Sequence, residues 1–161
     1  MIVIVIMGVI YTLSVTSFEQ RSEEFTKLTL LNIKEFMKNQ KYEKSVKILC
    51  LDDCKSCDVY VDNVKIKTLE DLLDDSVRVY RYEFLSGTRE VLKDIYFNEE
   101  DVQEDICFSY SVDKQGVGDQ VFVEFKESVY DFTTYLTPTK KYASLESAIE
   151  AAEQLIQEVN Q

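Results

Sequence analysis

The pattern of apolar residues divides the chain into an uninterrupted apolar start and a long remainder in which apolar and polar positions alternate. Residues 1–18 contain no charged residue, and no Lys or Arg precedes them. A lone segment in lipid satisfies its backbone polar groups only as a helix. As a helix, eighteen residues would rise about 27 Å, just short of a bilayer core of about 30 Å. We therefore expect residues 1–18 to form a membrane-anchoring helix.

Two other interpretations of the apolar start remain open. The small residues Val15 and Ser17 precede Phe18, as they would in a cleaved secretory signal, but the basic region that begins such signals is missing. The segment would also suit a buried element of a soluble domain, since its many β-branched residues favour a strand in water. The retained anchor is the interpretation that we carry forward.

The pattern of residues 19–44 predicts an amphipathic continuation of the same helix. This stretch contains neither Gly nor Pro, and its apolar residues recur at nearly helical spacing from Phe25 to Met37. Charged residues, among them Lys34, Glu35 and Lys38, occupy the remaining positions. We expect these charges to face solvent and the apolar stripe to pack on the remainder of the chain, residues 45–161, which we call the head.

Residues 45–161 alternate with the period of two that is typical of strands. Strands are predicted over 46–51, 57–61, 64–67, 77–82, 91–97, 106–112, 120–125 and 128–136. A short helix is expected to begin at Thr68 and end by Asp75, the segment 116–118 to turn a hairpin, and Pro138 to end the sheet. An amphipathic helix is expected after Ser144. The predicted fold class is therefore α+β: a long N-terminal helix packed on an antiparallel sheet of about six to eight strands, with a C-terminal helix.

Charge and composition limit the functions that the chain can have. The net charge of −12 and the pI near 4.5 argue against nucleic acid or an anionic lipid surface as a partner. The chain has no His, which excludes zinc sites that use imidazole and catalytic triads that depend on it. We find no motif for a cofactor, and we expect a protein that is not an enzyme.

The four cysteines form the densest chemical motif. Cys50, Cys54 and Cys57 have the C-x3-C-x2-C spacing of radical-SAM enzymes, with Cys107 further along. We reject that interpretation because Ser56 replaces the usual aromatic residue and the chain is too short for the required barrel. A four-cysteine metal site would need a reducing compartment, whereas two disulfides suit an exported protein. Three pairings are open, and we favour Cys54–Cys57 with Cys50–Cys107.

Two acidic segments are candidates for a cation. Residues 98–105 contain five acids, and Asp52, Asp53 and Asp58 lie beside the cysteines. Carboxylate oxygens bind Ca²⁺, but neither segment has EF-hand spacing. We therefore predict a solvated loop and a turn, and no metal site.

The apolar start resembles a known family. The run Met1-Ile-Val-Ile-Val-Ile-Met-Gly8-Val-Ile is similar to the interior of the N-terminal segment of type IV pilins and type II secretion pseudopilins. With Gly8 on the family's characteristic glycine, Thr16-Ser17-Phe18 falls where the family often has Pro-Ser-Phe. Met1 then lands just after the family's glutamate, so we expect the family's leader and first mature residues to lie upstream.

The resemblance implies a minor pilin or pseudopilin, a structural subunit that bundles its N-terminal helices and packs its heads in a filament. It also implies a single-pass location in the bacterial inner membrane, with the head in the periplasm. The partners would be other pilin or pseudopilin subunits, the inner-membrane assembly platform and the prepilin peptidase. Packing in the membrane and the filament would fall to Ile2, Val5, Ile6, Gly8, Val9, Leu13 and Phe18.

Two alternatives of other classes stay open. The chain is an exported soluble binding protein if the apolar start is a cleaved signal. It is a cytosolic metal-binding protein if the four cysteines hold zinc or iron.

Overall fold

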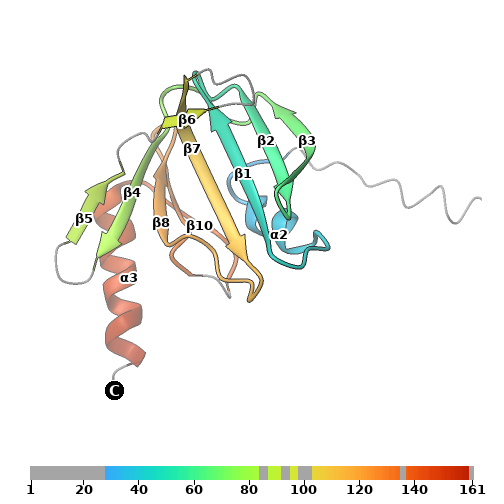
Figure 1. Cartoon of the computed structure of the whole chain (residues 1–161). Coiled ribbons are helices and arrows are strands. Elements are labelled where there is room, and N and C mark those ends of the chain that lie inside the picture. Colours follow the sequence, from blue (N-terminus) through green and yellow to red (C-terminus); the bar gives the residue numbers. More distant parts are fainter. Residues whose placement is uncertain (1–27, 84–86, 92–94, 98–102, 135–136, 160–161) are drawn as a thin grey trace, which may run out of the picture.

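The computed structural model describes residues 28–83, 87–91, 95–97, 103–134 and 137–159, and it folds them into two antiparallel β-sheets with two helices (Figure 1). The elements are α2 Ile33–Lys38, β1 Ser45–Leu51, β2 Ser56–Val61, β3 Val64–Glu70, β4 Arg78–Glu83, β5 Gly87–Glu90, β6 Ile95–Phe97, β7 Gln103–Asp113, β8 Val121–Glu124, β9 Val129–Asp131, β10 Lys140–Tyr142 and α3 Leu145–Val159. Sheet 1 has the strand order β3-β2-β1-β7-β6, and sheet 2 has the order β10-β9-β8-β4-β5.

The inner face of sheet 1 is built from alternate residues of its three central strands, as the period of two requires. Three cross-strand rows form this face: Val46 with Val61 and Val112, Ile48 with Val59 and Tyr110, and Cys50 with Cys57 and Phe108. All of these side chains are buried except that of Val61, which is partly buried. The rows make sheet 1 one wall of the main hydrophobic core.

Sheet 2 lies between sheet 1 and α3. Val121 and Val123 of β8 belong to the core that sheet 2 shares with sheet 1, and the Tyr110 and Phe132 rings meet edge to face there with centroids 4.9 Å apart. Phe122, between those two valines in sequence, faces the other way and packs with Ala148 of α3 in a second cluster. The molecule therefore has three layers, two sheets and then the C-terminal helix.

The chain changes sheets between β7 and β8, where a hairpin was predicted. β7 belongs to sheet 1 and β8 to sheet 2, and the turn between them is tied to β7 by an isolated bridge from Val112 to Gly118 and by hydrogen bonds between Ser111 and Asp119. The Asp113 carboxylate holds this turn by accepting hydrogen bonds from the N–H groups of Gln115 and Val117, both at 2.9 Å. The glycines thus mark a turn, as expected, but one that joins two layers.

The long amphipathic helix predicted over 19–44 is wrong for the part of it that the structure describes. Over residues 28–44 the only helix is α2, with six residues, and 19–27 lie outside the described residues. The Asp62 carboxylate accepts hydrogen bonds from the N–H groups of residues 43, 44 and 45, at 3.0, 2.7 and 3.1 Å. In a helix those N–H groups would bond to carbonyls four residues back, so Asp62 directs the chain into β1 instead.

The predicted fold class is accordingly corrected. Over the described residues the protein is mostly antiparallel β-sheet, and the longer of its two helices is α3, near the C-terminus. The core takes up Ile33 and Met37 of α2, which are fully buried. The short helix therefore belongs to the head and does not serve as a separate spine.

Two further local predictions are wrong. β3 continues through Thr68, where a helix was expected, because the Thr68 hydroxyl donates a hydrogen bond to Asp58 across the β2–β3 pair at 2.7 Å. Pro138 does not end the sheet, since β10 follows it and pairs with β9. Of the strand predicted over 91–97, only 95–97 is strand, and 92–94 lie outside the described residues.

The predicted single-pass location in the inner membrane is also contradicted. No helix within the described ranges has the length and apolar character needed to cross a membrane. The expected anchor, residues 1–18, lies outside those ranges, as do the packing positions assigned to it. They are Ile2, Val5, Ile6, Gly8, Val9, Leu13 and Phe18.

Candidate functional site

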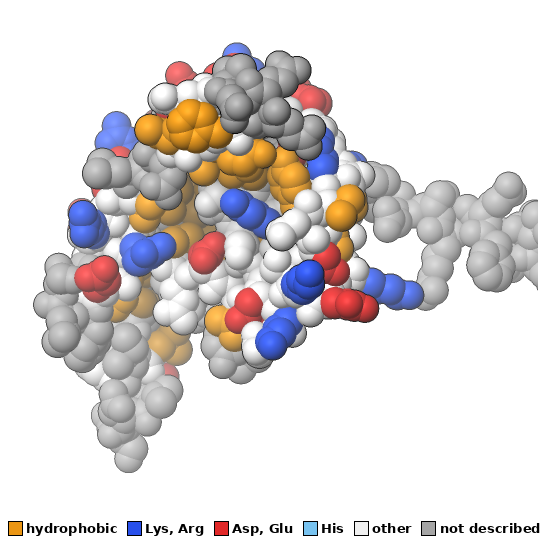
Figure 2. All heavy atoms as spheres, in the orientation of Figure 1, with side chains coloured by type: hydrophobic (Ala, Val, Ile, Leu, Met, Phe, Trp, Pro, Cys, Tyr) orange, Lys and Arg blue, Asp and Glu red, His pale blue; other side chains and the backbone are white. Residues whose placement is uncertain are grey.

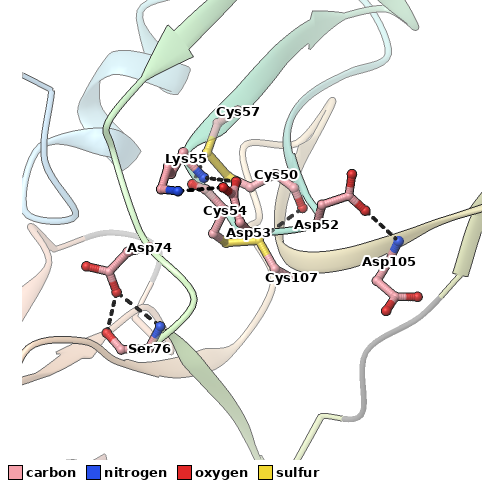
Figure 3. The surroundings of a disulfide bond; sticks show 10 residues. All are labelled: Cys50, Asp52, Asp53, Cys54, Lys55, Cys57, Asp74, Ser76, Asp105 and Cys107. Carbon is pink, nitrogen blue, oxygen red and sulfur yellow. Dashed lines mark hydrogen bonds and ion pairs between the residues drawn. A yellow bond between two sulfur atoms is a disulfide. The ribbon is translucent and has the colours of Figure 1, made fainter.

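The four cysteines lie together at one end of sheet 1 and form two disulfides (Figure 3). Cys50 of β1 is bonded to Cys57 of β2, and Cys54 in the β1–β2 turn is bonded to Cys107 of β7. Three of these side chains are fully buried, and Cys107 is 6 % exposed. The expectation of two disulfides is therefore confirmed, and the two bonds join three neighbouring strands.

The pairing differs from the one that we favoured. Cys50 and Cys57 are directly opposite in the β1–β2 register, with Cα atoms 4.0 Å apart. Cys54, whose φ is +64°, lies in the turn and faces β7, where the register with β1 skips Cys107. A β-bulge at this point re-aims the extra residue, so that Cys107 reaches Cys54 and not Cys50.

The sequence held only a partial signal for the observed pairing. The predicted strands 46–51 and 57–61 are joined by a short turn, and an antiparallel hairpin fixes its register through the turn. Centring the hairpin on residues 52–56 places residue 57 opposite residue 51, one position away from the observed partner Cys50. The bulge that frees Cys107 left no such signal in the sequence.

The acids near the disulfides build the turn. The Asp53 carboxylate accepts a hydrogen bond from the Lys55 N–H at 3.1 Å and pairs with the Lys55 ammonium at 2.7 Å. These contacts lower the pKa of Asp53 below its ordinary value. The Asp52 N–H donates to the Asp105 carbonyl at 2.8 Å. The turn interpretation of Asp52 and Asp53 is the one that fits these contacts.

A metal site at the cysteines does not fit this geometry, because a sulfur in a disulfide is not available as a thiolate ligand. Asp58, the third acid near the cysteines, pairs with Lys65 at 2.6 Å and accepts the Thr68 hydrogen bond. No cluster of three or more metal-ligating side chains occurs within the described part of the chain. The acidic segment 98–105 is described only from residue 103, so its other positions lie outside the structure's described ranges.

Sequence reasoning missed a buried polar group, the Lys34 ammonium. It was expected on the solvent face of a helix, but Lys34 is 3 % exposed and donates hydrogen bonds to the carbonyls of Thr134 and Thr137. Burial lowers the pKa of Lys34. Nearby, the Asp131 carboxylate accepts hydrogen bonds from the N–H and hydroxyl of Thr133, at 2.8 and 2.6 Å. Lys34 thereby ties α2 to Thr134 and Thr137, and Asp131 fixes Thr133.

The edges of sheet 1 are the second feature that sequence reasoning missed. Val64 and Ile66 on β3 are 64 % and 50 % exposed, and Ile95 and Phe97 on β6 are 55 % and 61 % exposed. The described residues of the edge strands of sheet 2 include no exposed large apolar side chain. Their exposed residues are charged: Arg89, Glu90, Lys140 and Lys141. Figure 2 shows apolar side chains gathered in a band across the upper part of the visible face, with charged side chains scattered below it.

Comparison with protein-family models gives no match, and no curated protein or solved structure matches the chain. The resemblance to pilins and pseudopilins therefore stays a prediction from the first eighteen residues. The disulfides and the two apolar edges of sheet 1 are the structural features on which a functional proposal rests.

Proposed function

We propose that this chain is an exported, non-enzymatic subunit that works by binding other protein subunits, in an assembly of the pilin or pseudopilin kind. The observation that carries the proposal is the pair of buried disulfides in sheet 1. Structural disulfides persist in oxidising compartments and are rare in the cytosol. The apolar start of the sequence, with its resemblance to pilins, supports the same conclusion.

The polar side chains favour binding over catalysis as the function, because their contacts hold the fold together. Lys34 and Asp131, the two buried charged side chains among the described residues, are engaged with main-chain and hydroxyl groups of Thr133 and Thr137. Asp58, Asp62 and Asp53 likewise hold strands or turns. Exposed apolar side chains at two sheet edges, in contrast, are typical of surfaces that meet other proteins.

The proposal concerns contacts between heads. The amphipathic continuation that was expected to reach Lys44 is not part of the proposal, because α2 has six residues. A contribution from residues 1–18 stays a prediction, because those residues lie outside the described ranges.

The alternative is an exported soluble binding protein whose apolar start is removed. One observation favours it: Ile33 and Met37 of α2 are buried in the core of the head, so the head has no need of a long helical spine. The two functions differ in the N-terminus of the mature chain and in the neighbours that the chain contacts.

Both functions are tested on the protein isolated from the cells that produce it. Mass spectrometry of the intact chain and its peptides gives the mature N-terminus and the disulfides, and cross-linking of whole cells gives the neighbours. The assembly subunit is expected to keep residues 2–17, to carry both disulfides and to cross-link to further subunits. A mature start at Phe18 with no such neighbours supports the soluble protein, and four reduced cysteines would refute export itself.

A further inference from the structure

The outer edge of β3 is the longest unpaired strand edge in the described part of the chain. β3 is the outermost strand of sheet 1 (Figure 1) and has seven residues, whereas β6, β5 and β10, which form the other three sheet edges, have three, four and three. Val64 and Ile66 on β3 are 64 % and 50 % exposed. An unpaired edge of this kind is a template for a further strand, and the longest edge offers the most main-chain hydrogen bonds.

The apolar inner face of sheet 1 continues onto this edge. Val64 is the register partner of Val61, which packs against the main core, and Ile66 lies at the β-bulge where the register shifts between Val59 and Tyr60. Residues directly opposite one another on paired strands share a face of the sheet. A strand added beside β3 would therefore extend the inner face by one row, and apolar side chains on that row would cover Val64.

Residues 2–6 have the composition of such a strand. They read Ile-Val-Ile-Val-Ile, without a charge, a Gly or a Pro, and β-branched residues favour strands in water. Short segments of this composition pair readily with an exposed edge. Lysines on an edge hinder pairing, and β3 carries Lys65 and Lys67. An uncharged strand brings no basic residue against them, and Lys65 keeps its ion pair with Asp58 of β2 at 2.6 Å.

The chain between residues 2–6 and the head is long enough to reach a neighbouring copy. The described chain begins at Leu28, which packs against the main core. Residues 7–27 span at most about 70 Å when fully extended, whereas a domain of this size has a radius of gyration of about 14 Å. Residues 2–6 can therefore lie on the β3 edge of a second copy.

We infer that residues 2–6 of one copy of this chain add as a strand to β3 of a second copy. The inference rests on the proposed function, for which it names the partner and the contact. Strand addition of this kind obtains its affinity from main-chain hydrogen bonds and its specificity from the side chains that the edge accepts. In this contact the apolar start is a strand, and not the helix expected from the sequence.

Each copy donates its own start and offers its own β3, so the contact joins two different surfaces of the chain. Interfaces of this heterologous kind give rings or open filaments and do not stop at a dimer. The contact therefore suits the repeating assembly of the proposed function, whereas addition of residues 2–6 to β3 of the same copy would leave a monomer.

A photo-cross-linking experiment locates the contact. The full-length chain carries p-benzoylphenylalanine in place of Val64, is purified with its disulfides in a mild non-ionic detergent, and is mixed with isotope-labelled chain. The detergent is then diluted below its critical micelle concentration, because micelles compete for the apolar start. The expected link joins position 64 of one copy to residues 1–8 of the other. The matched control carries the same group at Lys140, on an edge strand of sheet 2, and is expected to give no link to residues 1–8.

Two double substitutions test whether the segment acts as a strand. Val3→Pro/Ile4→Pro removes two adjacent N–H groups. Neighbouring N–H groups of a strand point to opposite sides, so one of the two prolines removes a hydrogen bond to β3 whichever way the strand lies. Val3→Thr/Ile4→Thr is the matched control, because it also removes apolar surface but keeps both N–H groups and the preference for a strand. Sedimentation velocity is expected to show self-association weakened at least tenfold more by the prolines than by the threonines.

The outcomes separate this inference from the proposed function. Strand addition between copies is overturned by links from position 64 only within one copy or to another surface of the second copy, by equal links from position 140, or by equal effects of the two double substitutions. Subunits found by whole-cell cross-linking would still support the function in each of these cases. A chain that stays monomeric at every concentration and shows no subunit neighbours in cells refutes both. Links from position 64 of one copy to residues 1–8 of the other, absent from the control, support the strand addition whichever assembly owns the chain.

Discussion

At the scale of single residues, Gly118 is a position where the fold needs the absence of a side chain. A Cβ there would lie 2.0 Å from the Tyr110 hydroxyl oxygen and 2.7 Å from its Cζ. Tyr110 is buried and packs edge to face on Phe132, so its ring has little room to move. We expect Gly118→Ala to lower the free energy of unfolding by about 1–3 kcal/mol, as measured by urea denaturation.

The same substitution in the Tyr110→Phe variant is the control for this prediction. Tyr110→Phe removes the hydroxyl that makes the shorter of the two contacts, so Gly118→Ala should cost less in the Tyr110→Phe background than in the original chain. Equal costs in the two backgrounds would show that the clash with the phenol is not the cause.

Tyr110 also predicts how stability changes with pH. Burial, and to a lesser extent the Asp119 carboxylate, raises the pKa of its phenol above the ordinary value, which is about 10. Below about pH 10 the phenol is protonated in both the folded and the unfolded chain. Above it the unfolded chain loses the proton first, so the free energy of unfolding falls.

We therefore expect urea denaturation to show a loss of stability as the pH rises above about 10, and a shallower loss in Tyr110→Phe. Lys34 opposes this trend, because its pKa is lowered by burial and deprotonation of the folded chain above that pKa favours folding. Lys34 is unchanged in the comparison, so the difference in slope belongs to Tyr110. Identical slopes for the two chains would contradict the assignment.

At the scale of elements, the sequence predicted strands well and their connections badly. The apolar run 46–51 gave β1. The patterns of residues 57–61 and 106–112 gave β2 and much of β7, because successive side chains of a strand point to opposite faces of the sheet. Asp62 and Asn63, which separate the predicted strands 57–61 and 64–67, form a turn with φ of +51° and +70°, as a two-residue hairpin requires. The amphipathic C-terminal helix is α3.

The failures have a common physical cause, which is a contact with a residue distant in sequence. The helix expected after Lys38 is replaced by hydrogen bonds that the Asp62 carboxylate accepts from backbone N–H groups. The helix expected at Thr68 is replaced by a strand, in which the Thr68 hydroxyl donates to Asp58 on the neighbouring strand. β7 and β8 look like a hairpin locally but lie in different sheets. Local periodicity does not contain such information, since tertiary contacts override propensity.

The disulfides show the same difference between what the sequence predicts and what depends on distant contacts. The sequence predicted that the four cysteines are bonded, because that follows from their number and from an exported context. It did not predict the partners, because these depend on the β1–β2 register and on the bulge at Cys107. The apolar edges of sheet 1 were likewise missed, since an edge strand is recognised only when the strand order is known.

The disulfide pairing predicts that the two disulfides stabilise the fold by different amounts. Cys54–Cys107 spans 53 residues of sequence, and Cys50–Cys57 spans 7. In the chain-entropy model a bond that closes the longer loop stabilises more, by about 4 against about 2.5 kcal/mol. We expect the double variant Cys54→Ala/Cys107→Ala to lose about 1.5 kcal/mol more than Cys50→Ala/Cys57→Ala, as measured by urea denaturation.

Peptide mapping of each variant is the control, because it shows that the remaining bond is the native one. Equal losses, or a greater loss for Cys50→Ala/Cys57→Ala, would show that packing around the bonds outweighs the closure of the loops.

At the scale of the whole molecule, the two disulfides are distributed unequally between the two sheets. Both lie within sheet 1 and join β1, β2 and β7, whereas sheet 2 and α3 have no disulfide and pack through the core and the second cluster. If heads bind one another through sheet 1, the covalent bonds reinforce the sheet that carries the contact. The free edges at either end of sheet 1 are then supported by its most strongly constrained strands.

The buried sulfur atoms should protect the two disulfides from reduction, and this protection can be measured. Thiolate attack on a disulfide requires access to the sulfur, and the four cysteines are at most 6 % exposed. Reduction of the folded protein by dithiothreitol should therefore depend on the opening of sheet 1 and should accelerate when urea promotes that opening. Thiol alkylation followed by mass spectrometry measures the rate, and oxidised glutathione serves as a control for effects of urea on the exchange chemistry. If either bond were reduced as fast as glutathione without urea, its end of sheet 1 would open locally, and the rigid edge that the head-to-head contact needs would be lost.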